Sequence, residues 1–127
     1  MDAAGGSLVL RDLSDRVIGA FFDTYNELGY GFLESVYESA LAIRLEESGL
    51  EVARQLPIEV RFHGQVVGQF RADLLVEGCL LIEIKAAAQI GTAHEAQLIN
   101  YLKATGIRVG LLLNFGPRPG FRRRVFS

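Results

Sequence analysis

The sequence contains one cysteine, no tryptophan, three prolines and no long uncharged apolar run. The single cysteine, Cys79, cannot form an internal disulfide, and it leaves no thiolate cluster for a structural zinc ion. No apolar run approaches the roughly 18 residues that a membrane-spanning helix needs. The first residues also lack the basic segment and apolar stretch of an export signal. We therefore expect no membrane contact and a reducing, cytoplasmic location.

The chain also lacks an excess of positive charge, because its formal net charge is −2. This balance excludes a protein that coats nucleic acid by bulk electrostatic attraction, so any contact with nucleic acid must be local. The basic residues of the C-terminal part are Lys103, Arg108, Arg118, Arg122, Arg123 and Arg124. Two interpretations of this concentration stay open, a solubilising tail and a rim that contacts phosphate groups.

The 127 residues, half of them hydrophobic, suffice for one compact domain with a core and are too few for two. No repeat, low-complexity tract or linker divides the chain. Residues 1–7 are rich in alanine and glycine, and we expect them to form a flexible N-terminal lead-in. Residues 8–127 are then expected to form a single domain.

Three amphipathic helices are expected. Apolar residues recur at three-to-four spacing from Leu13 to Leu28, and the glycines that follow end this first helix. A second apolar stripe predicts a helix over residues 33–48. The third helix is expected to begin with Thr92 as its cap and to stop at Gly106.

Between the second and third helices the apolar period changes from 3.6 to 2, which indicates strands. Residues 52–62 and 65–76 alternate apolar with polar side chains, and His63-Gly64 between them predicts a tight hairpin turn. Residues 79–87 and 107–115 are nearly all apolar, as in central strands covered on both faces. Because a helix separates these two strands, they should be parallel, with a right-handed crossover.

This order of elements predicts the fold class. Two helices, three strands, a helix and a strand give an α/β sandwich, an α-α-β-β-β-α-β core with a mixed central sheet flanked by helices. Residues 121–126 have the apolar alternation of a short closing strand, which would extend the sheet by one strand.

Three charged residues interrupt or adjoin the apolar strands: Asp73, Glu83 and Lys85. Burial of an unpaired charge is costly, so the three groups either neutralise one another or hold a metal ion. Glu83 and Lys85 share one face of their strand, since side chains alternate along a strand. A two-residue turn after Val76 sends Asp73 to the opposite face, whereas a three-residue loop places it beside Glu83.

A metal site requires the second of these registers. Two adjacent carboxylates repel each other unless a cation lies between them, and their hard oxygen ligands favour Mg²⁺ or Mn²⁺ over zinc. The competing interpretation is an edge strand whose charged side chains face solvent.

The spacing of Asp73 from the triplet Glu83-Ile84-Lys85 resembles the defining motif of the PD-(D/E)XK nuclease superfamily. Ala72 stands where that motif has proline. The pattern Gln97-x-x-x-Tyr101, on the helix expected after this strand, is similar to an element of the RecB-like and lambda-exonuclease-like branch.

A further motif lies upstream, where the segment from Gly31 through Glu34 to Tyr37 resembles the signature of the small bacterial and archaeal GxxExxY protein family. The resemblance covers residues 17–115, which is most of the chain. It implies a restriction-endonuclease-like fold and a Mg²⁺-dependent nuclease that hydrolyses DNA phosphodiester bonds.

The resemblance also implies roles for individual residues. The implied metal ligands are Glu34, Asp73, Glu83 and the backbone carbonyl of Ile84. Lys85 would orient or help to deprotonate the attacking water and stabilise charge on the phosphate, and it completes the catalytic set with the three carboxylates. The residues implied to bind substrate or support the site are Tyr37, His94, Gln97 and Tyr101.

Plainer interpretations and a rival function stand beside these expectations. From spacing alone, Glu34 is a surface acid, and Tyr37 and Tyr101 are core aromatics. The rival function is a nuclease fold with weak or no activity that serves as a binding or regulatory module, as a homodimer, because the short chain leaves little room for substrate-gripping insertions. In a third version, another protein supplies the substrate contacts.

Overall fold

The computed structural model describes residues 3–126, with side chains from residue 10 onward. Two helices, three strands, a helix and two strands follow one another along this part of the chain. In chain order they are α1 (Ala3–Leu28), α2 (Glu34–Glu47), β1 (Val52–Phe62), β2 (Gln65–Val76), β3 (Leu80–Lys85), α3 (Thr92–Thr105), β4 (Val109–Asn114) and β5 (Gly120–Val125). None of the described helices is both long and apolar enough to cross a membrane.

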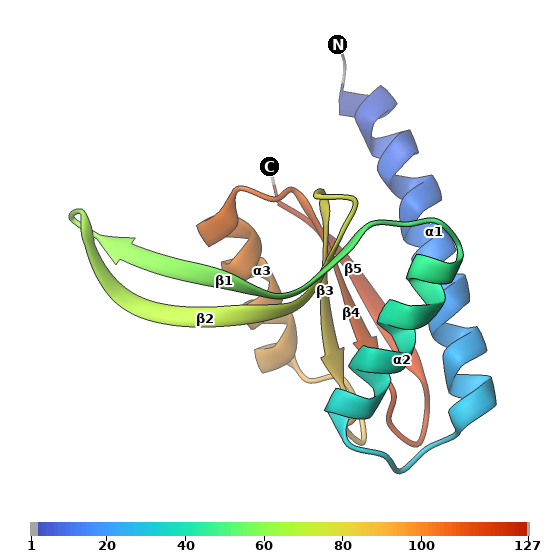
Figure 1. Cartoon of the computed structure of the whole chain (residues 1–127). Helices are drawn as coiled ribbons and strands as arrows, with labels where there is room; N and C mark the ends of the chain where they lie inside the picture. Colours follow the sequence, from blue (N-terminus) through green and yellow to red (C-terminus); the bar gives the residue numbers. More distant parts are fainter. Residues whose placement is uncertain (1–2, 127) are drawn as a thin grey trace.

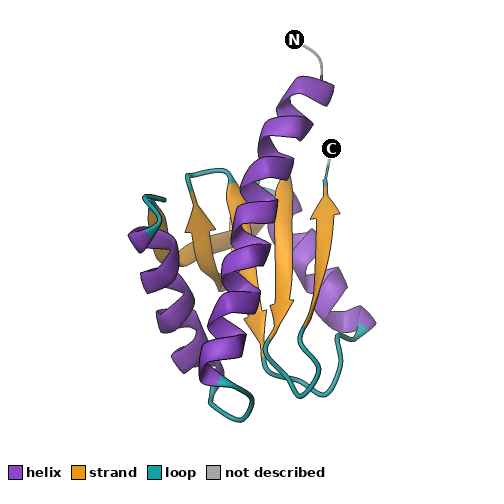
Figure 2. Ribbon diagram, turned by 90° about the vertical axis from the view of Figure 1, so that its right-hand side faces the viewer, coloured by secondary structure: helices purple, strands orange, loops and turns teal. Residues whose placement is uncertain are grey.

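The strands form one mixed sheet in the order β1-β2-β3-β4-β5. Neighbouring strands are antiparallel except β3 and β4, which run parallel because α3 lies between them in the chain. α1 and α2 cover one face of the sheet, and α3 covers the other (Figure 1 and Figure 2). This α/β sandwich confirms the fold class expected from the sequence.

Each face of the sheet has its own hydrophobic core. The core under α1 and α2 takes every second residue of β3 and β4: Leu80, Ile82, Ile84, Val109, Leu111 and Leu113. On the opposite face, Leu81 and Leu112 pack against α3. β3 and β4 are therefore covered on both sides, which explains their nearly continuous apolar sequence.

The connection between β2 and β3 decides which residues face each other across these strands. The paired residues are Leu74 with Ile82, Leu75 with Leu81 and Val76 with Leu80. Residues 77–79 therefore form a three-residue loop, and the next pair in this register is Asp73 with Glu83. Glu83 lies on the α3 face of the sheet with Leu81, and the register sets Asp73 opposite it, as the predicted metal site requires.

The β1–β2 hairpin bends where Gln55 lies opposite Asp73. Gln55 has a φ of 56°, a conformation that is uncommon for residues other than glycine, and the ladder passes over both residues. On the loop side of the bend, Ile58 and Ala72 pack under α3, whereas Leu74 on the other side packs under α1 and α2. The distal part of the hairpin consequently projects beyond the sheet (Figure 1).

Several predicted boundaries are confirmed, and one differs clearly. The predicted strands over residues 52–62 and 65–76 are β1 and β2, and the predicted closing strand is present as β5. α1 begins at Ala3 rather than at Leu13, so residues 3–7 lie in a helix where a lead-in was expected. Residues 1 and 2 lie outside the described part of the chain, and the flexibility of the segment stays a prediction.

The core under α1 and α2 offers a test of the packing. Ile82 is fully buried there, and Ile82→Ala is expected to lower the free energy of unfolding by about 2–5 kcal/mol, because the removed side chain leaves a cavity. Val67, on the projecting hairpin, is 63% exposed, and Val67→Ala should change this free energy by less than about 0.5 kcal/mol. Urea denaturation of the two variants measures the difference, and equal losses would contradict the described core.

Candidate active site

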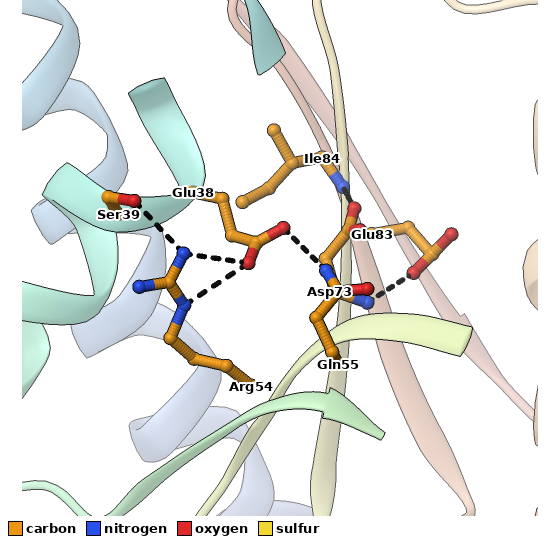
Figure 3. A network of polar contacts seen from close by, with 7 residues as sticks. All are labelled: Glu38, Ser39, Arg54, Gln55, Asp73, Glu83 and Ile84. Carbon is orange, nitrogen blue, oxygen red and sulfur yellow. Dashed lines mark hydrogen bonds and ion pairs between the residues drawn. The ribbon is translucent and has the colours of Figure 1, made fainter. Parts of the chain in front are cut away.

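Asp73 and Glu83 are joined by two hydrogen bonds that replace part of the strand ladder. The Asp73 backbone N–H donates to Oε2 of Glu83 at 2.8 Å, and the Ile84 N–H donates to Oδ2 of Asp73 at 2.7 Å (Figure 3). Each side chain is thus held by the backbone of the opposite strand. The bend in the hairpin makes this exchange feasible, because Asp73 is free of ladder pairing to β1.

Burial makes the ionised form of this pair costly. Glu83 is 5% exposed, and burial, followed by repulsion from Asp73, raises the pKa of Glu83 to about 8. Burial also raises the pKa of Asp73, although the hydrogen bond from Ile84 opposes this shift. The positive charge of Lys85 lowers both pKa values without outweighing the effect of burial. Among the described residues no cation forms an ion pair with either carboxyl.

Glu34, the first residue of α2, reaches the end of β3. Its Oε2 accepts a hydrogen bond of 3.1 Å from the N–H of Ala86, the residue that follows Lys85. The charge of Glu34 also raises the pKa of both Asp73 and Glu83, which places its carboxylate within electrostatic reach of the pair. Glu34 is thus an electrostatic neighbour of the pair, and its role as a metal ligand stays a prediction.

Tyr37 fixes the loop that leads into Glu34. Its buried hydroxyl donates to the carbonyl of Gly29 at 2.5 Å and accepts from the N–H of Phe32 at 3.2 Å. Its ring stacks on Phe115, with 4.4 Å between ring centroids and an interplanar angle of 15°. Tyr37 is thus both a core aromatic and a support for the site, because it holds the backbone from which α2 begins.

Lys85 is the last residue of β3 and lies on the same face as Glu83. It is half-buried, and its ammonium group forms no ion pair with any described residue. The side chain of Ile84 points to the opposite face, into the core under α1 and α2. The backbone carbonyl of Ile84 as a metal ligand stays a prediction.

Tyr101 and Gln97, two of the site residues predicted on α3, differ in their contacts. Tyr101 is buried, and burial followed by the charges of Glu83 and Asp73 raises the pKa of its hydroxyl, which therefore lies near the pair. Gln97 is half-buried one turn earlier and makes no side-chain hydrogen bond within the described residues. Its role stays a prediction.

His94 contacts the start of its own helix. Its Nδ1 accepts a hydrogen bond of 3.2 Å from the N–H of Gly91, which is the N-cap in place of the expected Thr92. Gly91 has no side chain to accept from the first-turn N–H groups, and His94, at the third helical position, accepts from the N–H of the N-cap residue itself. Within residues 3–126 no hydrogen bond or ion pair joins His94 to the acidic residues.

Glu38 is a further acid near the site that the sequence reasoning missed. It is 7% exposed and lies one helical turn after Glu34. Its Oε2 accepts from Arg54 at 3.0 Å, in an ion pair, and its Oε1 accepts from the amide of Gln55 at 2.8 Å (Figure 3). Its charge also raises the pKa of Asp73. The spacing of Glu34 and Glu38 on one helix face was the signal that could have identified it.

The donor set fits a hard divalent cation, although no ready-made cluster is present. Among the described residues, no three acidic, histidine or cysteine side chains converge closely enough to enclose an ion. Asp73 and Glu83 each use one carboxylate oxygen for a backbone N–H, and the second oxygen of each accepts no hydrogen bond within the described chain. Two such oxygens, with Glu34 nearby, are ligands that Mg²⁺ and Mn²⁺ prefer.

Comparisons with known proteins identify the family and the fold. A family model described as the PD-(D/E)XK nuclease superfamily matches residues 11–124, and no curated protein matches the chain. The crystal structure of SSO0001 is similar in fold, with a TM-score of 0.57 and 22% identity over 72% of this chain and 50% of that one. An alkaline exonuclease (LHK-Exo) from Laribacter hongkongensis is similar with a TM-score of 0.51 and 17% identity, over 68% of this chain and 52% of that one. The chain thus spans about half the length of each.

The raised pKa of Glu83 predicts that the metal-free protein becomes less stable as pH rises. The carboxyl has a pKa of about 8 in the folded chain and 4.5 as its ordinary value, so folding favours the protonated form. Its stabilising contribution is fully present below pH 4.5 and is lost as pH rises through about 8. Urea denaturation in EDTA should therefore show a falling free energy of unfolding over this range, and Glu83→Gln should flatten the fall.

The matched control for this experiment is Glu59→Gln, on the exposed part of β1, which should leave the pH profile unchanged. Added Mg²⁺ should stabilise the unaltered chain more at pH 8 than at pH 5, because a ligating carboxylate must be ionised. Identical pH profiles for the unaltered chain and Glu83→Gln would contradict the described burial.

The two hydrogen bonds of the Tyr37 hydroxyl predict a loss of stability in Tyr37→Phe. The change leaves the Gly29 carbonyl and the Phe32 N–H without their partner, and it should lower the free energy of unfolding by about 1–3 kcal/mol. Tyr30 belongs to the same loop but is 61% exposed, so Tyr30→Phe is the control and should have little effect. Thermal or urea denaturation compares the free energies of unfolding of the two variants. An equal effect would show that the hydroxyl of Tyr37 does not stabilise the loop.

Proposed function

Since the chain belongs to the PD-(D/E)XK nuclease superfamily, we propose that it is a metal-dependent nuclease that hydrolyses phosphodiester bonds of DNA. The observation that carries this proposal is the pair formed by buried Glu83 and half-buried Asp73, which has no ion pair with a described cation, with Lys85 on the same sheet face as Glu83. A structural ion pair would bring the positive charge into contact with the acids. Here the second oxygen of each carboxylate is left for another ligand.

In this proposal the metal ligands are Glu34, Asp73, Glu83 and the carbonyl of Ile84. A bound Mg²⁺ or Mn²⁺ supplies polarisation of the phosphoryl oxygen and a lower pKa for water. The raised pKa of Glu83 means that its proton must leave before it can ligate, so loading with metal depends on pH.

In this proposal Lys85 supplies the positive charge that acts on the attacking water and on the phosphate. Its ammonium group, with no ion pair in the described chain, orients the attacking water and stabilises negative charge on the phosphate. The water oxygen gives up a proton to solvent and forms a bond to phosphorus, while the bond to the leaving oxygen breaks and that oxygen takes up a proton from solvent. Tyr101, whose hydroxyl lies near the acidic pair, and Gln97 one turn before it position Lys85 or the phosphate.

Two features support the alternative of a binding or regulatory module with little activity. No three ligating groups of the described chain enclose an ion, and the chain spans about half the length of two solved structures with this fold. In that alternative, a second copy of the chain or another protein supplies the substrate contacts. Cleavage by the purified chain separates the two functions.

The cleavage experiment uses labelled single-stranded DNA, double-stranded DNA and RNA with Mg²⁺ or Mn²⁺ at pH 8. Asp73→Asn and Glu83→Gln keep the side-chain volume and should each lower the cleavage rate at least about a hundredfold, because each removes a charged metal ligand. EDTA should abolish cleavage.

Glu59→Gln removes a carboxylate outside the site and serves as the control, with unchanged cleavage expected. Circular dichroism shows that each variant is folded. If none of the nucleic acids is cut with either metal, or if the site variants cut at the rate of the unaltered chain, the nuclease proposal is wrong.

A further inference from the structure

A pocket of about 320 Å³ lies beside the candidate site, between the loop after β3 and the loop that joins β4 to β5. Both loops lie at the edge of the sheet where β3 and β4 end (Figure 1 and Figure 2). Arg118 and Arg122 line the pocket on one side, Gln89 and Ile90 on the other, and Asn114 lies between them. The pocket thus combines two guanidinium groups with neutral hydrogen-bonding groups.

Strand pairing places the pocket in line with the acidic pair. Glu83 pairs with Leu112 of β4, and Leu112 pairs with Arg122 of β5, so these three side chains form one row on the α3 face. Two strand spacings separate β3 from β5, which is roughly 10 Å. This row of side chains therefore runs from the acidic residue Glu83 on β3 to the positively charged residue Arg122 on β5.

The walls of the pocket are held rigidly, although they are loops. The side-chain amide of Asn114 accepts from the N–H of Ala87 at 2.9 Å and donates to its carbonyl at 3.0 Å. Gly116 lies so close to that carbonyl that a Cβ at this position would be 1.8 Å from its oxygen. The hydroxyl of Tyr25, on α1, donates to the carbonyl of Gly116 at 2.9 Å. The loop after β3 and helix α1 thus hold the loop between β4 and β5.

The same loop presents Arg118 to solvent between two prolines, Pro117 and Pro119. Proline fixes its own φ and restricts the residue before it, so the backbone at Arg118 has little freedom to lose on binding. Arg118 forms no ion pair within residues 3–126. Nε of Arg122 lies 3.8 Å from Oε2 of Glu95. The carboxylate of Glu95 also pairs with Arg124, so the two arginines share one negative charge.

We propose that this pocket binds a phosphate group of the nucleic-acid backbone next to the phosphate at the metal site, through Arg118 and Arg122. The inference rests on the proposed function for its substrate. A guanidinium group presents several N–H donors in a plane that matches phosphate oxygens, and phosphate contacts of this kind set the register of a nucleic acid on a protein. Of the two interpretations of the C-terminal arginines, the phosphate-contacting rim therefore applies to these two.

The experiment measures binding of a labelled DNA oligonucleotide to the full chain by fluorescence anisotropy in EDTA, so that no cleavage occurs. Arg118→Ala and Arg122→Ala should each weaken binding about tenfold and reduce the slope of log affinity against log salt by about one. Arg118→Lys keeps the charge but not the fork of donors, and it should recover the salt slope with only part of the affinity.

The control is Arg108→Ala, which removes one positive charge from the opposite end of β4 and should change affinity less than about twofold. Affinity of Arg118→Ala and Arg122→Ala equal to that of the unaltered chain, or absence of DNA binding by the unaltered chain, would overturn the inference. A second arm titrates inorganic phosphate by calorimetry. If Arg118→Ala abolishes phosphate binding but leaves oligonucleotide affinity unchanged, the pocket is a site for free phosphate, and the inference is wrong.

Failure of the proposed function gives a different result. If the unaltered chain cuts no nucleic acid but its DNA binding depends on Arg118 and Arg122, the phosphate pocket stands and the catalytic proposal is wrong. If the chain cuts DNA and both arginine variants bind and cut as the unaltered chain does, the catalytic proposal stands and the pocket is not a phosphate site.

Discussion

The candidate site depends on one constraint, the register between β2 and β3 that sets Asp73 opposite Glu83. A slip of one residue would turn Asp73 to the other face of the sheet. The three-residue loop that prevents this has positive φ angles at Glu77 and Gly78, and it is held from outside. Glu77 donates its N–H to the carbonyl of Glu51 at 2.8 Å, and its Oε2 accepts from the Glu51 N–H at 2.6 Å. The start of β1 thus fixes the placement of the acids.

Around this pair, each acidic residue near the site has a distinct electrostatic environment. Glu38 is buried and neutralised by Arg54, whereas Glu34 is exposed and bonded only to a backbone N–H. Glu83 is buried and Asp73 half-buried, and neither forms an ion pair with a described cation, so burial raises the pKa of both carboxyls. A divalent cation would remove that cost of ionisation, which is the physical basis of the metal site proposed above.

Much of the fold could be predicted because the local patterns are strong. Alternation of side chains and the His63-Gly64 turn fixed both strands of the first hairpin, and continuous apolar runs identified β3 and β4 as covered strands. The start of α1 was missed because residues 3–7 contain Gly5 and Gly6, which are weak helix formers, so the apolar pattern begins only later. The cap of α3 was missed because His94 supplies the acceptor from inside the helix.

The sequence by itself determined the element order and the fold class, and it supplied Asp73, Glu83 and Lys85 as candidates for the site, since residue types and spacing are local properties of the chain. Tertiary structure alone decided that the loop after β2 has three residues, that Glu38 is buried beside Arg54, and that Arg122 falls in one row with Glu83. These relations join residues far apart in sequence, and they depend on a bend at Gln55 and on strand pairing, which no local pattern specifies.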